Sequence, residues 1–341
     1  MKQTPLLEIK DLTIHYVTYE GTVRAVENLN LRLGQGETLG FVGETGAGKT
    51  TTALGIMRLI PNPPGRFIQG QILLSGEDLL RKSDKEMREI RGNKIAMIFQ
   101  DPMTSLNPVQ PVGEQIAEMI RLHTNLSKDE AMKKAGEMLE TVGIQASRSP
   151  DFPHQFSGGM KQRVVIAIAL ACNPALLIAD EPTTALDVTI QAQVLALMKE
   201  LKDKYQTSLI MITHDLGIVA EICDKVAIMY AGTIVEYADK RPLFLKPLHP
   251  YTVGLFNSVP DIDTDETELK VIKGLMPDPT DLPSGCTFHP RCPQAQAACV
   301  EKRPAMVEAE PGHFVACLMY QATSGGGRYR EWLKNCWTFR I

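Results

Sequence analysis

The sequence predicts an α/β fold built around a phosphate-binding loop, and three observations lead to this prediction. Residues 43–50, Gly-Glu-Thr-Gly-Ala-Gly-Lys-Thr, fit the pattern of a glycine, four residues and Gly-Lys-Ser/Thr. An apolar run at 38–42 precedes the loop and a helix-like run at 51–57 follows it. A further apolar run, 176–179, ends in two carboxylates, as a buried parallel strand beside an active site can. We therefore predict that the chain binds a nucleoside triphosphate.

The chemistry of this loop follows from its residue types. Its glycines let the backbone bend and aim successive N–H groups at a phosphate, and the following helix adds its positive N-terminal end. Lys49 is expected to contact the β- and γ-phosphates, and Thr50 to offer its hydroxyl to Mg²⁺. A glycine-rich turn that binds nothing is the alternative, which the Lys-Thr ending and the flanks disfavour. The residues expected to bind nucleotide here are Gly43, Glu44, Thr45, Gly46, Ala47, Gly48, Lys49, Thr50 and Thr51.

Length and composition narrow the class of protein. With 341 residues, the chain suggests one large domain plus an appendage, or two domains. The hydrophobic fraction of 44% and charged fraction of 22% are those of a soluble globular protein, and a net charge of −4 gives no basis for a nucleic-acid partner. The longest apolar run, 164–172, is too short to span a membrane, and residues 1–5 do not begin a signal peptide. We expect the protein to stay in the cytosol.

The N-terminal region alternates apolar and polar residues from 7 to 33, with Glu20-Gly21 between the halves. This pattern predicts antiparallel strands joined by a hairpin turn. Tyr16 ends the first strand shortly before the phosphate loop, where its ring could stack on a nucleotide base. A tyrosine buried in a strand explains the same residue equally well.

A helical insertion is predicted from the three- and four-residue apolar spacing between 112 and 149. After it, Ser157-Gly158-Gly159 forms a polar turn that opens a helix running to about 172. Ser157 can cap that helix and leave its free N–H groups for an anion. Taken alone, such a turn is more often a plain loop than a ligand site.

Polar residues follow three apolar strands at their carboxyl ends. Gln100 follows 94–99 and is well placed to reach a metal or water, while His214 follows 208–213 and can hydrogen-bond a γ-phosphate. Asp180 can hold Mg²⁺ through water, and Glu181 can polarise an attacking water molecule. Each of these residues is a weak signal alone, and a lone histidine, for example, is more often structural. The prediction depends on their occurring together.

With these residues in hand, the first 240 or so resemble the nucleotide-binding subunit of ABC transporters. The resemblance implies a RecA-like core, an antiparallel β subdomain and a helical subdomain. It also implies that Lys49, Gln100, Glu181 and His214 serve catalysis, that Thr50, Gln100 and Asp180 hold Mg²⁺, and that Tyr16 stacks on the base. Residues 43–50 look like the Walker A loop, Gln100 looks like the glutamine of the Q-loop, and residues 157–162 look like the ABC signature. Asp180 looks like the Walker B aspartate and Glu181 like the catalytic glutamate. Residues 185–187 look like the D-loop, and His214 looks like the switch histidine.

The signature departs from the commonest Leu-Ser-Gly-Gly-Gln form, because Phe156 comes first and Met160 last. Since Ser157, Gly158 and Gly159 are retained, we expect it still to bind phosphate.

Beyond the cassette, residues 248–252 and 285–293 resemble the C-terminal extension of oligopeptide, dipeptide and nickel importer ATPases. We therefore divide the chain into a nucleotide-binding domain, a small irregular cysteine-rich extension and a tail that the sequence does not place. The predicted ranges are 1–245 for the domain, with its helical subdomain at about 103–160, then 246–322 for the extension and 323–341 for the tail.

Four of the seven cysteines, Cys286, Cys292, Cys299 and Cys317, lie in the extension. In a reducing compartment, metal binding by these cysteines is favoured over disulfides. A short segment with few buried apolar residues also needs another source of stability, such as a bound metal. Four thiolates suit zinc or an iron–sulfur cluster, but zinc sites usually pair cysteines two to four residues apart and no pair here is that close, so the spacing disfavours zinc. Zinc and free or disulfide-linked thiols stay open as alternatives.

The resemblance implies a [4Fe–4S] cluster, since some of the resembling ATPases carry one on this cysteine set. The segment is far from the phosphate loop in sequence, and hydrolysis needs no redox step. We therefore expect a structural or regulatory role, and nucleotide binding that is spared by Cys292→Ser.

The function implied by the resemblance is ATP hydrolysis that energises import of dipeptides or oligopeptides, with ATP clamped between one Walker A loop and the partner's signature. The implied partners are a second, related but different, ABC ATPase subunit, two membrane permease subunits and an extracytoplasmic substrate-binding protein, with no nucleic acid. The implied location is the cytoplasmic face of the inner membrane. Import of nickel or another small solute is one alternative. A soluble ABC protein acting on ribosomes or DNA is another, which a single cassette without coiled coils or basic arms disfavours.

Overall fold

The N-terminal alternation forms an antiparallel sheet of four strands in the order β2-β1-β4-β5. The computed structural model describes residues 5–184, 186–258 and 271–321 of the chain. The hairpin predicted at Glu20-Gly21 is present, with Thr18 opposite Gly21. The strands are β1 (Leu7–Thr18), β2 (Gly21–Leu33), β4 (Gly65–Leu74) and β5 (Glu77–Asp78).

The second sheet has eight strands in the order β11-β12-β10-β9-β3-β8-β7-β6. β9, β3, β8, β7 and β6 run parallel, and β3, β7 and β8 are buried along their whole length, which explains their continuous apolar sequences. The carboxyl ends of these strands meet at one edge, where the predicted site residues follow them. The strands are β3 (Thr38–Val42), β6 (Ile95–Ile98), β7 (Leu176–Asp180), β8 (Ser208–Ile212), β9 (Lys225–Tyr230), β10 (Thr233–Asp239), β11 (Val307–Glu310) and β12 (His313–Val315).

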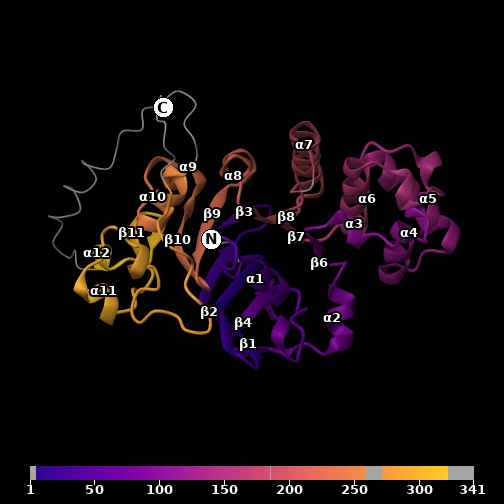
Figure 1. Cartoon of the computed structure of the whole chain (residues 1–341). Helices are drawn as coiled ribbons and strands as arrows, with labels where there is room; N and C mark the ends of the chain where they lie inside the picture. The colour runs from indigo at the N-terminus through magenta and orange to yellow at the C-terminus, as the bar shows by residue number, and fades with distance from the viewer. Residues whose placement is uncertain (1–4, 185, 259–270, 322–341) are drawn as a thin grey trace.

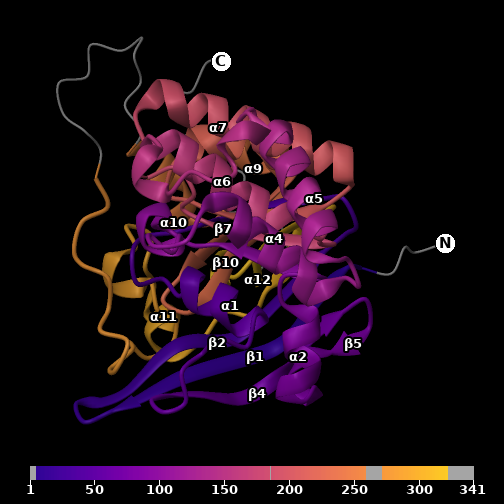
Figure 2. The same cartoon turned by 90° about the vertical axis from the view of Figure 1, so that its right-hand side faces the viewer.

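Helices surround this core, and four of them form the helical subdomain at one end of the molecule (Figure 1). Figure 2 looks onto that end and shows the antiparallel sheet below it. Ser127 and Glu130 form a capping box that starts α5, as the sequence pattern favours. The helical subdomain holds α3 (Pro102–Ser105), α4 (Val112–His123), α5 (Lys128–Thr141) and α6 (Gly158–Leu170), with 3₁₀ turns η2 (Ala146–Arg148) and η3 (Pro153–Gln155). The others are α1 (Lys49–Ile56), η1 (Leu79–Arg81), α2 (Asp84–Ile90), α7 (Val188–Tyr205) and α8 (Leu216–Ile222).

The extension, predicted to be small and irregular, adds two strands to the core sheet. β12 pairs with β10, placing Val315 opposite Glu236, and β11 pairs with β12. Figure 1 shows the extension at the end of the molecule away from the helical subdomain. The last helix before the extension is α9 (Lys240–Leu245). The helices of the extension are α10 (Pro250–Asn257), η4 (His289–Arg291), α11 (Ala297–Glu301) and α12 (Leu318–Gln321). The unplaced tail, 323–341, lies outside the described residues.

Two apolar clusters make up the core. One joins the antiparallel sheet to α1 and to one face of the core sheet. The other joins the helical subdomain to the opposite face and extends to Tyr251 and Phe288 of the extension, which are both fully buried. The extension is thus part of the packed core. Among the described residues, the helices are all too short or too polar to cross a membrane.

Candidate active site

The phosphate loop turns sharply between β3 and α1, and two of its glycines lie against neighbouring backbone. Gly48 has φ +103°, a conformation that other residues rarely adopt, and a Cβ there would overlap the carbonyl oxygen of Ala25. A Cβ on Gly43 would likewise overlap the carbonyl oxygen of Met229. These positions need glycine, and the loop has the strand–loop–helix context that the sequence predicted.

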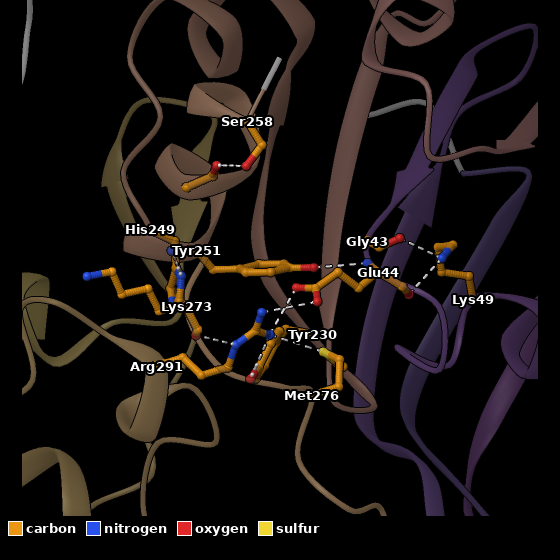
Figure 3. Close-up of polar contacts among 11 residues, drawn as sticks. Gly43, Glu44, Lys49, Tyr230, His249, Tyr251, Ser258, Lys273, Met276 and Arg291 are labelled. Carbon is orange, nitrogen blue, oxygen red and sulfur yellow. Dashed lines mark hydrogen bonds and ion pairs between the residues drawn. The ribbon is translucent and has the colours of Figure 1, made fainter. Parts of the chain in front are cut away.

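Lys49 begins α1 and folds back over the loop. Its side chain is buried, and its ammonium donates to the carbonyl oxygens of Gly43 at 2.7 Å and Glu44 at 3.0 Å (Figure 3). Burial lowers the pKa of Lys49, while the negative charges of Glu181, Asp180 and Glu44 oppose that shift. The cation is therefore held at the mouth of the loop, where a triphosphate would meet it.

Asp180 ends β7 and lies beside the first turn of α1. It is buried and accepts a hydrogen bond from the Thr50 side chain. Burial raises the pKa of Asp180, the hydrogen bond from Thr50 opposes the rise, and the charge of Glu181 adds to it. A carboxylate and a hydroxyl facing each other at the phosphate loop are oxygen ligands of the kind that Mg²⁺ prefers. The residues fit the predicted magnesium site.

Glu181 contacts the polar residues that follow the neighbouring strands. Its carboxylate accepts from Gln100 Nε2 at 2.8 Å and Thr184 Oγ1 at 3.1 Å, and lies 3.2 Å from Nδ1 of His214. Burial opposes ionisation, but the hydrogen bonds from His214 and Thr184 outweigh it and lower the pKa of Glu181. At neutral pH this group is a carboxylate, the form that can accept a proton from water.

Gln100 was predicted to reach a metal or water. In the structure its side-chain amide contacts Glu181, and no contact with Asp180 or Thr50 is present among the described residues. Its assignment as a magnesium ligand stays a prediction.

The extension reaches the phosphate loop directly. The backbone N–H of Glu44 donates to the Tyr251 hydroxyl at 2.9 Å. The carboxylate of Glu44 pairs with both terminal nitrogens of Arg291, at 3.0 and 3.2 Å (Figure 3). These contacts join residues more than 200 positions apart, so no local sequence pattern predicts them.

Comparisons with known proteins agree with this geometry. The family model described as "ABC transporter" matches residues 26–184, and the one described as "Oligopeptide/dipeptide transporter, C-terminal region" matches residues 235–299. An oligopeptide transport ATP-binding protein, OppD of Bacillus subtilis, is 54% identical over 318 residues, covering 92% of this chain and 89% of that protein. The dipeptide transport ATP-binding protein DppD of the same species is 49% identical, covering 92% and 94%.

The chain belongs to the ATP-binding subunits of oligopeptide and dipeptide ABC transporters. Among solved structures, the dimeric ATP-binding cassette MJ0796 bound to ADP and Pi superposes with a TM-score of 0.62 at 27% identity, covering 69% of this chain and 99% of that one. This confirms the predicted family and fold, including the antiparallel β subdomain.

The predicted signature lies at the start of α6. Ser157 caps the helix by accepting from the N–H of Met160 at 3.4 Å, and Gly158 is exposed. A Cβ on Gly159 would overlap the side chain of Ile190 at the start of α7, so the glycine permits close helix packing. Figures 1 and 2 both show α6 apart from α1. One chain therefore carries the signature away from its own phosphate loop.

The D-loop can be described only in part, because Ala185 lies outside the described residues. Leu186 packs against the core, and Asp187 caps α7 by accepting from the N–H of Ile190 at 3.0 Å.

Tyr16 lies near the end of β1, opposite Val23 on β2 and Gly65 on β4. It is half-buried and packs against the apolar cluster of the antiparallel sheet. This placement accounts for Tyr16 as a packed strand residue, and base stacking stays a prediction.

The four extension cysteines are half-buried free thiols. Burial, with the neighbouring thiols adding to it, raises the pKa of Cys292 to about 11 and that of Cys317 to about 12. Within residues 5–184, 186–258 and 271–321, no three His, Cys, Asp or Glu side chains are arranged to hold a metal ion. The [4Fe–4S] cluster and its zinc alternative therefore stay predictions.

Three residues that contact the site, Thr184, Tyr251 and Arg291, were not predicted from the sequence. Thr184 sits three residues after Glu181, where the turn after β7 returns its hydroxyl to that carboxylate. Tyr251 and Arg291 lie in the two segments that resemble importer ATPases, but the sequence of those segments does not indicate that they contact the phosphate loop.

Proposed function

We propose that this subunit binds ATP at residues 43–51, hydrolyses it in a pair of cassettes, and thereby energises import of oligopeptides or dipeptides through a separate permease. The observation that carries the proposal is the carboxylate of Glu181, ionised beside the phosphate loop and oriented by three hydrogen-bonding side chains. Peptide transport is what the named relatives and the matched C-terminal family model have in common.

Each residue of the site has a distinct role in this proposal. Lys49 supplies positive charge to the phosphates, and Thr50 and Asp180 would hold Mg²⁺, which offsets phosphate charge when bound. Glu181 accepts the proton of the attacking water. Gln100 and His214 fix the direction of its carboxylate, and His214, which is largely exposed, is free to meet a γ-phosphate.

The paired arrangement follows from the position of the signature. Ser157 and Gly158 are exposed on α6, away from α1, so a second cassette must bring its own signature to this phosphate loop. The similar cassette MJ0796 is described as dimeric with ADP and Pi bound. We propose a related but different chain as partner, together with two permease subunits and an extracytoplasmic binding protein. The assembly would place this subunit at the cytoplasmic face of the inner membrane.

An apolar groove between the core and the helical subdomain is the proposed docking site for the permease. It has a volume of about 580 Å³ and lies at the segment that leads from β6 to Gln100. Leu59, Phe99 and Leu122 line it and are exposed. Exposed apolar side chains gathered in one groove mark an interaction site. A permease segment bound there would contact Phe99, the residue before Gln100, and the side chain of Gln100 contacts the Glu181 carboxylate.

The cluster in the extension is a finer proposal. It is supported by the four half-buried free cysteines of this small unit. No catalytic step depends on it. Anaerobic purification tests it, and we expect a brown protein with about four iron atoms per chain. One zinc and no iron, or neither metal, would overturn it in favour of zinc or of free thiols.

Import of nickel or another small solute stays the alternative to peptides. ATPase stimulation of the reconstituted transporter by a panel of loaded binding proteins separates them, because the ATPase itself contacts no solute. A soluble ABC ATPase acting on ribosomes or DNA would copurify with those particles and not with membrane proteins.

Glu181→Gln is the experiment that tests the catalytic proposal. The variant should bind ATP normally, because Lys49, Thr50 and Asp180 are unchanged, and should trap a dimer with the partner cassette. Turnover in the assembled transporter should fall about 10²- to 10⁴-fold, the usual contribution of a general base. Lys49→Ala is the control that loses binding itself. Near-normal turnover of Glu181→Gln would refute the role of Glu181.

A further inference from the structure

We propose that Arg291 and Tyr251 of the C-terminal extension are positioning residues of the phosphate loop, through which the extension sets the affinity for ATP. The inference rests on the proposed function, since it concerns the same nucleotide site. Both residues contact Glu44, the second residue of the loop.

The extension holds Glu44 at two points. Tyr251 accepts from its backbone N–H, and Arg291 pairs with its carboxylate through both terminal nitrogens. A paired arrangement of this kind fixes the plane of the carboxylate as well as its position. The carbonyl oxygen of the same residue accepts from the Lys49 ammonium at 3.0 Å. A single loop residue therefore links the extension to the lysine that would meet the phosphates (Figure 3).

Arg291 is held in place before it reaches Glu44. Its side chain is only 6% exposed, against 30% for that of Glu44. Its Nε donates to the carbonyl oxygen of Lys273 at 3.2 Å, and its guanidinium carbon lies 5.8 Å from the centre of the Tyr230 ring. An ion pair buried on one side and held by further contacts loses less to side-chain entropy and salt than a surface pair.

The turn that carries Arg291 rests on an aromatic cluster. Phe288, just before η4, packs against Tyr230 and Tyr251 with ring centres 5.1 and 5.4 Å apart, and the two tyrosines lie 4.7 Å from each other. All three rings are fully buried. Because Tyr230 lies on β9, this cluster fixes Tyr251 and the turn that carries Arg291 to the core sheet, and loss of that packing would release both contacts with the loop.

Charge gives this contact a consequence for nucleotide binding. Glu44 places a negative charge at a loop whose purpose is to bind phosphates, and Arg291 neutralises it. Without Arg291, the carboxylate would repel the triphosphate and would be free to turn towards it. Arg291 therefore favours ATP binding by removing a repulsion, and this effect depends on the charge of Glu44. That dependence separates a positioning role from a merely structural one.

Binding of a fluorescent ATP analogue to the full chain tests the inference. Arg291→Met should weaken binding about 5- to 30-fold, as expected for an unneutralised charge several ångströms from the phosphates. Glu44→Gln removes a negative charge from the loop and leaves the charge of Arg291 uncompensated, so this variant should bind ATP more tightly than the unmodified chain. The double variant carries neither charge and should therefore bind ATP about as well as the unmodified chain. Arg303→Met is the matched control, since Arg303 lies in the same extension and pairs with Glu27 instead of the loop.

Two results would overturn the inference: unchanged affinity in Arg291→Met, or a loss of affinity that Glu44→Gln does not restore. If Arg291→Met does not fold, Arg291→Lys replaces it, and its loss of affinity should be smaller but restored in the same way. Tyr251→Phe should weaken binding less than Arg291→Met and should not be restored by Glu44→Gln, because its contact is with the backbone. Failure of the unmodified chain to bind ATP would instead refute the proposed function.

Discussion

Replacing Glu236 should detach the extension from the core sheet. Glu236 lies on β10 with no exposed surface, and its carboxylate accepts from the N–H groups of Leu248 at 2.7 Å and His249 at 2.8 Å. It also contacts Nε2 of His313 on β12 at 2.7 Å. One buried side chain thus holds both the start of α10 and the added strand. Each hydrogen bond to a charged group contributes about 1.5–3 kcal/mol, and a buried donor left without a partner costs about 1–3 kcal/mol.

Glu236→Gln keeps the shape but sets an amide NH₂ against a backbone N–H, so one or two of the three contacts are lost. We expect destabilisation of about 2–4 kcal/mol for this variant, and more for Glu236→Ala. Urea unfolding, followed by intrinsic fluorescence and by protease sensitivity of the extension, measures the loss. Glu200→Gln, at an exposed position on α7, is the control for the change in charge. If Glu236→Gln unfolds at the same urea concentration as that control, the reasoning is wrong.

Three further predictions concern the groove, the loop and pH. Leu122→Asp should reduce copurification with the permease, whereas Val109→Asp, an exposed change outside the groove, should not; equal recovery would exclude the groove as docking site. Gly48→Ala should lose ATP binding at least tenfold because its Cβ overlaps the Ala25 carbonyl, whereas Gly46→Ala meets no atom within 4 Å, brings only the strain of its φ of +83° and should lose less. Burial lowers the pKa of His249 to about 3 in the fold, while the unfolded chain binds a proton near pH 6.5. Stability should therefore fall as pH drops from 6.5 towards 3, by about 2 kcal/mol between pH 7 and 5, and His249→Asn should flatten that dependence in urea unfolding.

The cassette was predictable because its signals are local. The phosphate loop, the buried parallel strands and the polar residues after them are each read from a few neighbouring positions. Parallel strands bring their carboxyl ends to one edge, so residues following β6, β7 and β8 had to meet there. The structure adds which pairs form. Gln100 contacts Glu181, and Thr184 joins them through a turn whose geometry the sequence does not specify.

The extension was less predictable because its contacts are long-range. The pairing of β12 with β10 brings together residues about 80 positions apart, in strands too short to show alternation. The contact between Arg291 and Glu44 depends on where that packing places a turn. The cysteine pattern and the family resemblance predicted a metal site, but the residues of such a site would have to be brought together by the same long-range packing, which the sequence does not specify.

The different directions of the Asp180 and Glu181 side chains depend on a strained backbone. In a continuing strand, neighbouring side chains would point to opposite faces of the sheet, one of which is the buried core. Instead, β7 ends at Asp180, and Glu181 has φ +46°, a conformation that costs a residue with a side chain about 1–3 kcal/mol. The Glu181 N–H still donates to Ile212 of β8 at 2.9 Å, which fixes the turn while the side chain swings towards Gln100 and His214. Glycine would relieve the strain but would bring no carboxylate, so the strain is the cost of placing the proposed base beside the proposed metal ligand in two consecutive residues.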